Sequence, residues 1–199
     1  GLLFVLSGPS GVGKGTVCER LFLYRPSLQI STSLTTRPPR PGEVAGRDYD
    51  FTTPARFQEL ISEDAFLEWA VVHGHYYGTL KETVEENLAR GTDLLLEIDV
   101  QGALQVRRRL AGAVLIFMAP PSMEALYMRI AGRATEDAAH MKRRLEAAQH
   151  ELAAYCHYDY LVVNDRVEEA AASISAIMEA EKCRVSRGAR PPGWGGEER

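Results

Sequence analysis

A glycine-rich segment near the start of the chain has the residue types and spacing of a phosphate-binding loop. It reads GPSGVGKGT from Gly8 to Thr16 and lies between the apolar run Leu2–Leu6 and the helix-like stretch Val17–Leu23. Glycines let consecutive backbone N–H groups converge on one anion, and the helix that follows adds the partial positive charge of its N-terminus. Lys14 supplies an ammonium for the terminal phosphates. The spacing G-x-x-x-x-G-K predicts a nucleotide-binding protein, against the alternative of a glycine-rich turn with a surface lysine.

The residue after the lysine departs from the common form of this loop. Gly15 stands where a Ser or Thr would offer its hydroxyl to Mg²⁺, and Thr16 follows one place later. The ending GKGT resembles that of adenylate kinases and some other nucleoside monophosphate kinases, which implies a competent loop. We expect Mg²⁺ to be coordinated through water or with help from Thr16. The residues expected to hold ATP are Gly8, Pro9, Ser10, Gly11, Val12, Gly13, Lys14, Gly15 and Thr16.

Further blocks make the resemblance more specific. They are SLTTRPPRPGEVAGRDYDF from Ser33, FLEWA around Glu68, HYYGT at His75–Thr79, EIDVQGA at Glu97–Ala103, PPSMEAL at Pro120–Leu126 and YDYLVVND at Tyr158–Asp165. Together with the phosphate loop, these blocks resemble the guanylate kinases, which phosphorylate GMP with ATP. The resemblance covers about residues 1–187. It implies that GMP contacts Ser33, Arg37, Arg40, Tyr49, Glu68, Tyr77 and Thr79, and that adenine lies near Asn164 and Asp165.

The chemistry of these residue types points to the same ligand. Arg37 and Arg40 can clamp phosphate oxygens with planar guanidinium groups, and tyrosine hydroxyls can add donors. Guanine presents N1–H and N2–H₂ as donors and O6 as an acceptor, so a selective site needs a carboxylate and nearby neutral donors. Glu68 with Ser33 and Thr79 meets that need. The alternatives are surface arginines, packing tyrosines and an ordinary exposed helix acid.

Two acidic residues follow another apolar run. Asp99 stands where a second strand end in P-loop proteins orients Mg²⁺ and its waters, and it resembles the family aspartate at that place. Glu97 stands where many relatives have aspartate, and its role is open between the metal shell and the guanine amino group. Helix capping is the alternative for both. The predicted metal residues are thus Thr16 and Asp99, with Mg²⁺ as the cofactor.

A basic segment, Ser122–His150, could close over the phosphates as a lid. It carries Arg129, Arg133, Lys142, Arg143 and Arg144 on helical stretches that flank the turn-like Ala134–Asp137. We expect Arg133 and Arg144 to stabilise the transferred phosphoryl group, together with Lys14 and Asp99 and with Arg37 and Arg40 on the acceptor. The family lid commonly carries Arg-Gly-Thr where this chain has Arg133, Ala134 and Thr135. A solvated, salt-bridged helix face is the alternative.

The elements that must position these residues follow from the hydrophobic pattern. Continuous apolar runs predict buried parallel strands at Leu2–Leu6, Leu94–Ile98, Val114–Ala119 and Tyr160–Val163, with a weaker one at Leu28–Ser31. Helical patterns lie at Val17–Leu23, Pro54–Ile61, Lys81–Ala89, Gly102–Leu110, Ser122–Ile130, Ala138–Tyr155 and Glu168–Ser186. This order predicts an α/β fold of the P-loop NTPase type, a parallel sheet between layers of helices.

One domain is expected, because 199 residues are too few for two large cores. Its core should comprise 1–32, 80–121 and 151–187, with a GMP-binding insertion at 33–79, a helical lid at 122–150 and a disordered tail at 188–199. The insertion is too polar to lie inside the main sheet and too long for an idle loop.

Composition limits the partners. The net charge of −4 gives no general attraction for nucleic acid or anionic membrane, so small nucleotides, ATP and GMP with dGMP as a further acceptor, are the expected partners. Three widely spaced cysteines indicate neither a disulfide framework nor a zinc site. With no apolar stretch long enough to span a membrane, these features imply a cytoplasmic protein. The oligomeric state stays open between monomer and homodimer.

The expected reaction is GMP plus ATP giving GDP plus ADP, by positioning and charge stabilisation without a general base. A rival of another class is a non-catalytic guanylate-kinase-like module that binds phosphopeptides. Such modules typically lack the intact loop glycines and lysine, which this chain has. A second rival is a kinase of the same fold with another phosphorylated acceptor, against which the set of Glu68, Ser33 and Thr79 argues.

Overall fold

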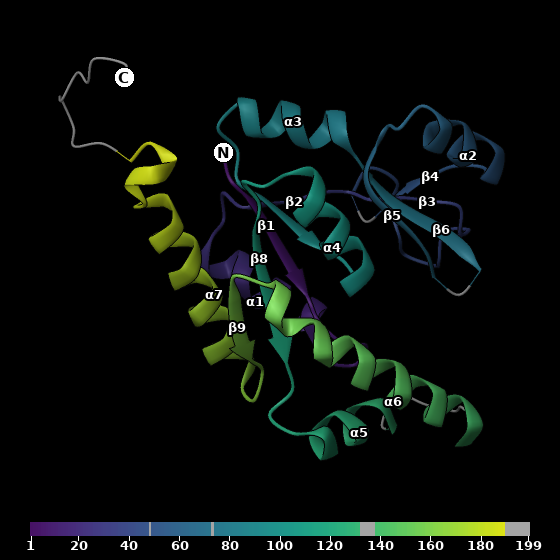
Figure 1. Ribbon diagram of the computed structural model, residues 1–199. Coiled ribbons are helices and arrows are strands. Elements are labelled where there is room, and N and C mark those ends of the chain that lie inside the picture. The colour runs from purple at the N-terminus through teal and green to yellow at the C-terminus, as the bar shows by residue number, and fades with distance from the viewer. Residues whose placement is uncertain (48, 73, 132–137, 190–199) are drawn as a thin grey trace.

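A computed structural model describes residues 1–47, 49–72, 74–131 and 138–189 of the chain. The main body is a parallel sheet of five strands in the order β2-β7-β1-β8-β9 (Figure 1). The strands are β1 (Leu3–Ser7), β2 (Gln29–Ile30), β7 (Leu94–Glu97), β8 (Val114–Ala119) and β9 (Tyr160–Val163). All four pairings in this sheet are parallel. The predicted α/β class is therefore confirmed, and each of the five apolar runs forms a strand.

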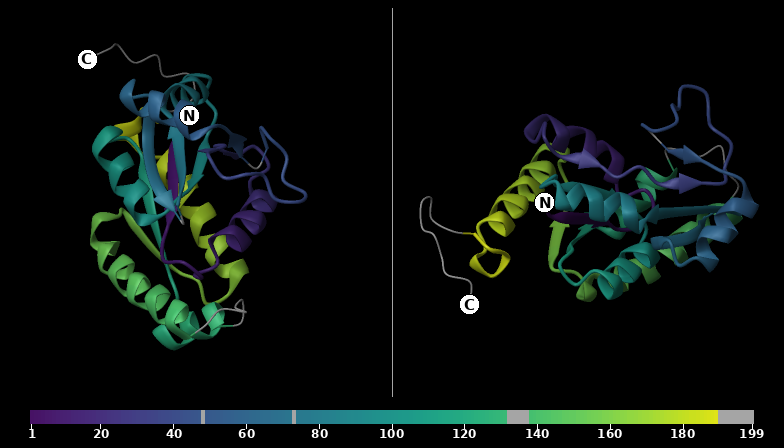
Figure 2. Two further views of the ribbon diagram at one scale, coloured as in Figure 1. Left: turned by 90° about the vertical axis from the view of Figure 1, so that its right-hand side faces the viewer. Right: turned by 90° about the horizontal axis from the view of Figure 1, so that it is seen from above.

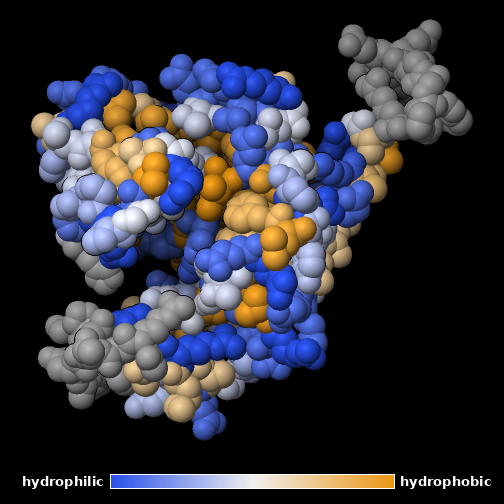
Figure 3. Space-filling model, turned by 180° about the vertical axis from the view of Figure 1, so that it is seen from behind, coloured by the Kyte–Doolittle hydropathy of each residue, from blue (hydrophilic) through white to orange (hydrophobic). Residues whose placement is uncertain are grey.

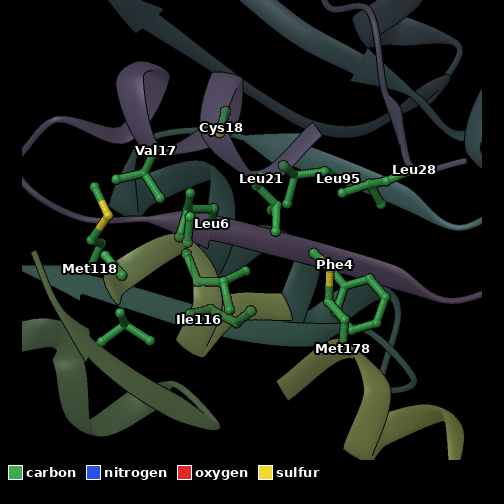
Figure 4. Close-up of a cluster of buried hydrophobic side chains, with 14 of the residues drawn as sticks. Phe4, Leu6, Val17, Cys18, Leu21, Leu28, Leu95, Ile116, Met118 and Met178 are labelled. Carbon is green, nitrogen blue, oxygen red and sulfur yellow. The ribbon is translucent and has the colours of Figure 1, made fainter. Parts of the chain in front are cut away.

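Helices cover both faces of this sheet, because its strands are apolar on both sides. They are α1 (Lys14–Tyr24), α3 (Lys81–Ala89), α4 (Val100–Arg109) and α7 (Val167–Lys182), and the chain from α7 leads into the short η2 (Val185–Arg187). On one face Phe4 and Leu6 of β1 pack with residues of α1 and α7 (Figure 4). On the other face Leu3 and Val5 pack with residues of α3 and α4. The alternation along β1 thus joins two apolar clusters, and every one of its side chains is buried.

The polar segment between β2 and α3 forms a second sheet, which the sequence analysis did not predict. Its order is β4-β3-β6-β5, with β3 (Leu34–Thr35), β4 (Asp50–Phe51), β5 (Phe66–Val72) and β6 (His75–Leu80). The predicted helix of this region is α2 (Pro54–Ser62), whose Phe57 stacks on Phe66 at 4.3 Å and on Tyr76 at 5.1 Å between ring centroids. Three aromatic rings therefore give this small sheet a core of its own.

Helix α4 joins the two sheets. The side-chain amide of Gln105 accepts a hydrogen bond from the Trp69 backbone N–H at 3.2 Å and donates one to the Trp69 carbonyl at 2.7 Å. Arg109 donates to the carbonyl of Phe66. Strand β5 is the edge of its sheet, so side chains of α4 occupy backbone positions that a neighbouring strand would otherwise take.

Two further helices lie at the opposite end of the molecule from the small sheet. These are α5 (Met123–Ala131) and α6 (Ala138–Ala153), and α6 continues into the short η1 (Ala154–His157). Figure 2 shows them below the main sheet, and Figure 3 shows the surface hollowed between them and the small sheet. The two candidate ligand pockets described below are lined by the small sheet, the end of β7 and the loop between β1 and α1. Among the described helices, none has the length and apolar character needed to cross a bilayer.

Several helix boundaries differ from the predicted ones. Helix α1 begins at Lys14 rather than Val17, because the loop passes directly into the helix through Gly13. Helix α4 begins at Val100 rather than Gly102, because the Asp99 side chain caps it. Helix α7 ends at Lys182, four residues short of the prediction. The predicted tail falls mostly on residues 190–199, which lie outside the described part of the chain.

Candidate active site

The phosphate loop depends on glycine at two positions. Gly8 has φ of 152°, and a Cβ there would lie 2.2 Å from the carbonyl oxygen of Met118 in β8. Gly13 has φ of 96° in the left-handed region and is the residue before α1. These two positions bend the chain sharply between β1 and α1. The loop surrounds a pocket of about 410 Å³ lined by Ser10, Gly11, Gly13, Lys14, Gly15, Thr16, Glu19 and Glu97.

Lys14 lies over this loop. Its Nζ donates to the Gly8 carbonyl at 2.7 Å and lies 3.5 Å from the Pro9 carbonyl. Burial lowers the pKa of Lys14, while the carboxylates of Glu97, Glu151 and Asp99 act in the opposite direction. The ammonium is therefore held in place by the loop itself before any ligand binds.

Two side chains hold the loop by donating hydrogen bonds to the same backbone carbonyl. The carbonyl of Val12 accepts from Asn164 Nδ2 at 2.8 Å and from Arg129 Nη1 at 3.3 Å. Arg129 Nη2 also donates to the Asn164 carbonyl at 2.9 Å. Asn164 is only 3% exposed. The Asn164 amide and the Arg129 guanidinium thus support the loop from within the protein, and the expected position of adenine near Asn164 stays a prediction.

A second pocket, of about 250 Å³, opens between the two sheets. It is lined by Ser33, Tyr49, Glu68, Ala70, Val72, Tyr77, Glu97, Ile98 and Asp99. Six of these residues were predicted from sequence to contact the acceptor nucleotide or its metal. Glu97 lines this pocket and the loop pocket alike, so the two cavities meet at its side chain.

Glu68 is the buried carboxylate of the second pocket. It is 4% exposed, and the Thr79 hydroxyl donates to its Oε1 at 2.6 Å across the β5–β6 pair. Burial raises the pKa of Glu68 to about 7, although the bonds from Thr79 oppose this. The alternative of an exposed helix acid is wrong, because Glu68 lies on a strand and faces inward.

Gly102 permits the approach of α4 to this carboxylate. A Cβ on Gly102 would lie 2.6 Å from Glu68 Oε2, which is closer than any contact between these atoms allows. Asp99 Oδ1 accepts from the Gly102 N–H at 2.8 Å and caps the helix. One residue of α4 thus fixes Asp99 through its amide and makes room for Glu68. Sequence reasoning missed Gly102, for which the run QGA beside Asp99 was the available signal.

The arginine and tyrosine cluster lies at one side of the same pocket. Arg37 Nε donates to Tyr77 Oη at 3.1 Å, and the Arg37 guanidinium carbon lies 5.3 Å from the centre of the Tyr49 ring. The two Nη atoms of Arg37 form a bidentate pair with Glu43, each at 2.9 Å. The pair raises the pKa of Arg37 and lowers that of Glu43.

Glu43 was not predicted from sequence, and it changes the expectation for Arg37. The arginine is 9% exposed and its fork faces Glu43 instead of an open pocket. Glu43 also accepts from the backbone N–H of Arg40 at 2.7 Å, while the Arg40 side chain is exposed. Glu43 therefore fixes the Arg37 guanidinium, whereas the Arg40 side chain faces solvent.

Glu97, which is partly buried, lies near Lys14 and Cys18 of α1. Burial raises the pKa of Glu97, and the Lys14 ammonium and a hydrogen bond with Cys18 oppose this. A Cβ on Gly15 would lie 3.8 Å from Glu97 Oε2, an ordinary contact distance. The absence of a side chain at position 15 thus leaves the Glu97 carboxylate facing the loop pocket.

Two residues of α6 contact the loop at Ser10. Arg144 Nη2 donates to Ser10 Oγ at 3.2 Å, and Glu151 Oε2 accepts from the Ser10 N–H at 3.2 Å. Arg133, with Ala134 and Thr135, lies outside the described residues. Asp165 is exposed at the end of β9, and its predicted contact with adenine stays a prediction.

The donor set around the loop pocket suits Mg²⁺. Thr16, Glu97 and Asp99 offer hard oxygen atoms, and among the described residues no group of three or more His, Cys, Asp or Glu side chains could hold a metal unaided. Magnesium commonly keeps several waters and binds through one or two carboxylates plus substrate phosphates. The residues present fit that arrangement.

Comparison with known proteins places the chain beside one set of enzymes. The family model described as "Guanylate kinase" matches residues 2–181. The chain is 51% identical to the guanylate kinase of Caldanaerobacter subterraneus subsp. tengcongensis, covering 94% of this chain and 91% of that protein. It is 49% identical to the guanylate kinase of Desulfitobacterium hafniense, covering 94% of each. The crystal structure of guanylate kinase from Anaplasma phagocytophilum aligns with a TM-score of 0.77 at 37% identity, covering 94% of this chain and 89% of that one.

Proposed function

The chain belongs to the guanylate kinase family, a family of nucleoside monophosphate kinases, and from that premise we propose that it transfers the γ-phosphoryl group of ATP to GMP, giving ADP and GDP. The observation that carries the proposal is the junction of the two pockets. A loop built for phosphates and a pocket with a buried carboxylate share Glu97 as a common wall. A donor and an acceptor bound in these pockets would have their phosphates side by side.

In this proposal, Glu68 selects guanine. Its carboxylate accepts from N1–H and N2–H₂, while the Thr79 hydroxyl and Ser33 complete the set of polar groups around the base. Adenine presents no such pair of donors, so a buried carboxylate would be left unpaired against it. Because burial raises the pKa of Glu68 to about 7, hydrogen bonds from guanine would also stabilise the ionised form of this acid.

The acceptor phosphate is held at the tyrosine and arginine cluster. Tyr49 and Tyr77 line the pocket and offer hydroxyl donors, and Arg37 is fixed behind them by Glu43. Arg40 is exposed and supplies a second guanidinium from the loop. Fixing Arg37 before binding reduces the entropy that the phosphate would otherwise have to remove from a long side chain.

We assign catalysis of phosphoryl transfer to positively charged side chains that lie close to the transferred phosphoryl group. Lys14 is held over the loop by the Gly8 carbonyl, and Arg144 reaches the same loop through Ser10. Arg133 is assigned the same role from sequence alone. We assign Asp99, Thr16 and Glu97 to hold Mg²⁺ through water, and the bound ion would supply positive charge to the reacting phosphates.

The main alternative, a non-catalytic module that binds phosphopeptides, is not favoured by the loop. Gly8 and Gly13 have the conformations the loop needs, and Lys14 lies over it. As part of the proposal we place the reaction in the cytoplasm, where both nucleotides are dissolved.

The test is a coupled assay that measures ADP release with GMP, dGMP, AMP, UMP and CMP as acceptors. We expect GMP and dGMP to be used best, because the predicted contacts recognise the base and the phosphate and none reaches the ribose. Rapid ADP release that is independent of the acceptor, or equal use of AMP and GMP, would contradict the proposal.

A further inference from the structure

Two side chains of helix α6 contact the phosphate loop at Ser10. Arg144 donates to the Ser10 hydroxyl and Glu151 accepts from the Ser10 backbone N–H, both at 3.2 Å. Arg144 and Glu151 are seven residues apart on one helix, which puts them two turns apart on the same face. The two contacts therefore join one face of α6 to the loop.

The Glu151 contact has an unusual partner. Ser10 lines the loop pocket, and its amide is among those expected to bind donor phosphates. A carboxylate on that amide is an anion in an anion-binding loop. The Lys14 ammonium is also close enough to favour the ionised form of the Glu151 carboxylate.

Glu151 is half-buried, and the charged groups that act on it are the Lys14 ammonium and the Asp99 carboxylate. Burial raises the pKa of Glu151, while the Ser10 amide and Lys14 oppose this and Asp99 adds to it. Donor phosphates would bring further negative charge close to Glu151. Two negative groups that both contact the Ser10 amide would repel each other strongly where water is partly excluded. The Glu151 carboxylate and a terminal phosphate therefore cannot share the amide.

We propose that the Glu151 carboxylate takes the place of a donor phosphate at the Ser10 amide. It must leave this amide when the donor nucleotide binds. The inference rests on the proposed function, since it assumes that this loop binds the donor. Leaving the amide removes one of the two contacts that hold α6 at Ser10. Donor binding is thereby coupled to the position of the helix that carries Arg144.

Two variants separate occupancy from charge. Glu151→Ala removes both the carboxylate and its contact, whereas Glu151→Asp keeps the charge but is one methylene too short to reach the Ser10 amide. Glu124→Gln on α5 is the matched control, because it removes an exposed lid carboxylate. Isothermal titration of each protein with magnesium–ATP, magnesium tripolyphosphate and GMP gives the affinities.

If Glu151 occupies the amide, both Glu151 variants bind magnesium–ATP and tripolyphosphate more tightly than wild type, by roughly 3- to 10-fold, the scale of a partly exposed charged hydrogen bond. Their affinity for GMP should stay within about 2-fold of wild type, and Glu124→Gln should bind all three ligands as wild type does. KM for ATP should fall with the dissociation constant. A role in folding alone would not produce this pattern.

Three results would overturn the inference. The first is unchanged or weaker donor binding in Glu151→Ala. The second is tighter donor binding in Glu151→Ala but unchanged donor binding in Glu151→Asp, and the third is a lower melting temperature of the variants with unchanged affinities. The second would mean that only long-range charge matters. Failure of the proposed function is distinguishable, because it appears as wild-type protein that does not phosphorylate GMP in the coupled assay, whatever the Glu151 variants do.

Discussion

Replacing Glu68 by glutamine should improve the stability of the ligand-free protein and impair its selectivity for GMP. Glu68 is buried, with Thr79 as its side-chain partner, and its pKa lies near 7 instead of near 4.5. The folded state therefore binds the Glu68 proton more tightly than the unfolded chain does. The stabilisation this gives is complete below about pH 4.5 and is lost as the pH rises through 7.

The size of the effect follows from the pKa difference. A shift from 4.5 to about 7 corresponds to about 3 kcal/mol at 1.36 kcal/mol per unit. Glutamine has a similar volume and cannot ionise, so the variant avoids this loss. Its amide N–H₂ needs acceptors that the site was not built to provide, which reduces the gain. We expect Glu68→Gln to exceed wild type in stability by about 1 to 3 kcal/mol at pH 7.5 and by much less at pH 4.5.

The catalytic effect has the opposite sign. A glutamine would turn one acceptor oxygen into a donor facing guanine N–H groups, and such a mismatch lowers kcat/KM for GMP by roughly 10- to 200-fold. AMP, which lacks that pair of donors, should lose much less.

Urea unfolding at the two pH values and coupled assays with both acceptors test the two halves separately. Glu85→Gln, an exposed acid on α3, is the control for removing one charge. Equal losses for GMP and AMP would move guanine recognition away from Glu68. A Glu68→Gln variant less stable than wild type at pH 7.5 would contradict the prediction, because it would mean that the folded protein stabilises the ionised Glu68 carboxylate.

Further predictions concern the loop, the metal shell, α4 and the lid. Lys14→Ala should lower kcat by at least ~10²-fold with little change in fold by circular dichroism, and near-normal turnover would exclude Lys14 from the chemistry. Asp99→Asn keeps the cap on Gly102, so the magnesium concentration for half-maximal rate should rise while the melting temperature stays constant, and an unchanged magnesium titration would remove Asp99 from the metal shell. Gly102→Ala puts a Cβ 2.6 Å from Glu68 Oε2 and should raise KM for GMP by up to about 10²-fold, whereas Gly112→Ala, with nothing within 4 Å of its Cβ, should match wild type. Arg144→Ala should lower kcat with little change in the melting temperature; the reverse pattern would mean that Arg144 only supports the helix.

The main sheet could be predicted from sequence because its strands are buried on both faces. Such strands read as continuous apolar runs, and Leu2–Leu6 and Val114–Ala119 were recognisable for that reason. The phosphate loop was recognisable because glycines and a lysine are needed at fixed spacing. Both patterns lie within short segments of the chain, so a single sequence is enough to recognise them.

The small sheet and the supporting contacts could not be predicted in the same way. Strands β3 and β4 have two residues each, and β5 places Glu68 among apolar residues, so neither period nor hydrophobicity marks them clearly. The pairing of Arg37 with Glu43 and the support of Val12 by Asn164 depend on how segments meet in space. Residue type suggested a ligand contact for Arg37 and the family resemblance suggested one for Asn164, and the structure shows that each side chain also bonds to other parts of the protein.

The bonds between Gln105 and Trp69 have a consequence for the newly made chain. An exposed sheet edge is a template on which another chain can pair, and β5 is such an edge until α4 covers it. Gln105 lies 36 residues after Trp69, so at 5–20 residues per second the ribosome delivers it roughly 2 to 7 seconds later. During that interval β5 and β6 can form a hairpin with one open side.

A glutamine side chain then closes that side with the same donor and acceptor that a strand would present. Leucine or alanine at position 105 would preserve the helix and leave the edge exposed in the finished protein. The cost would appear as aggregation during synthesis and refolding, in a protein whose catalytic groups are untouched.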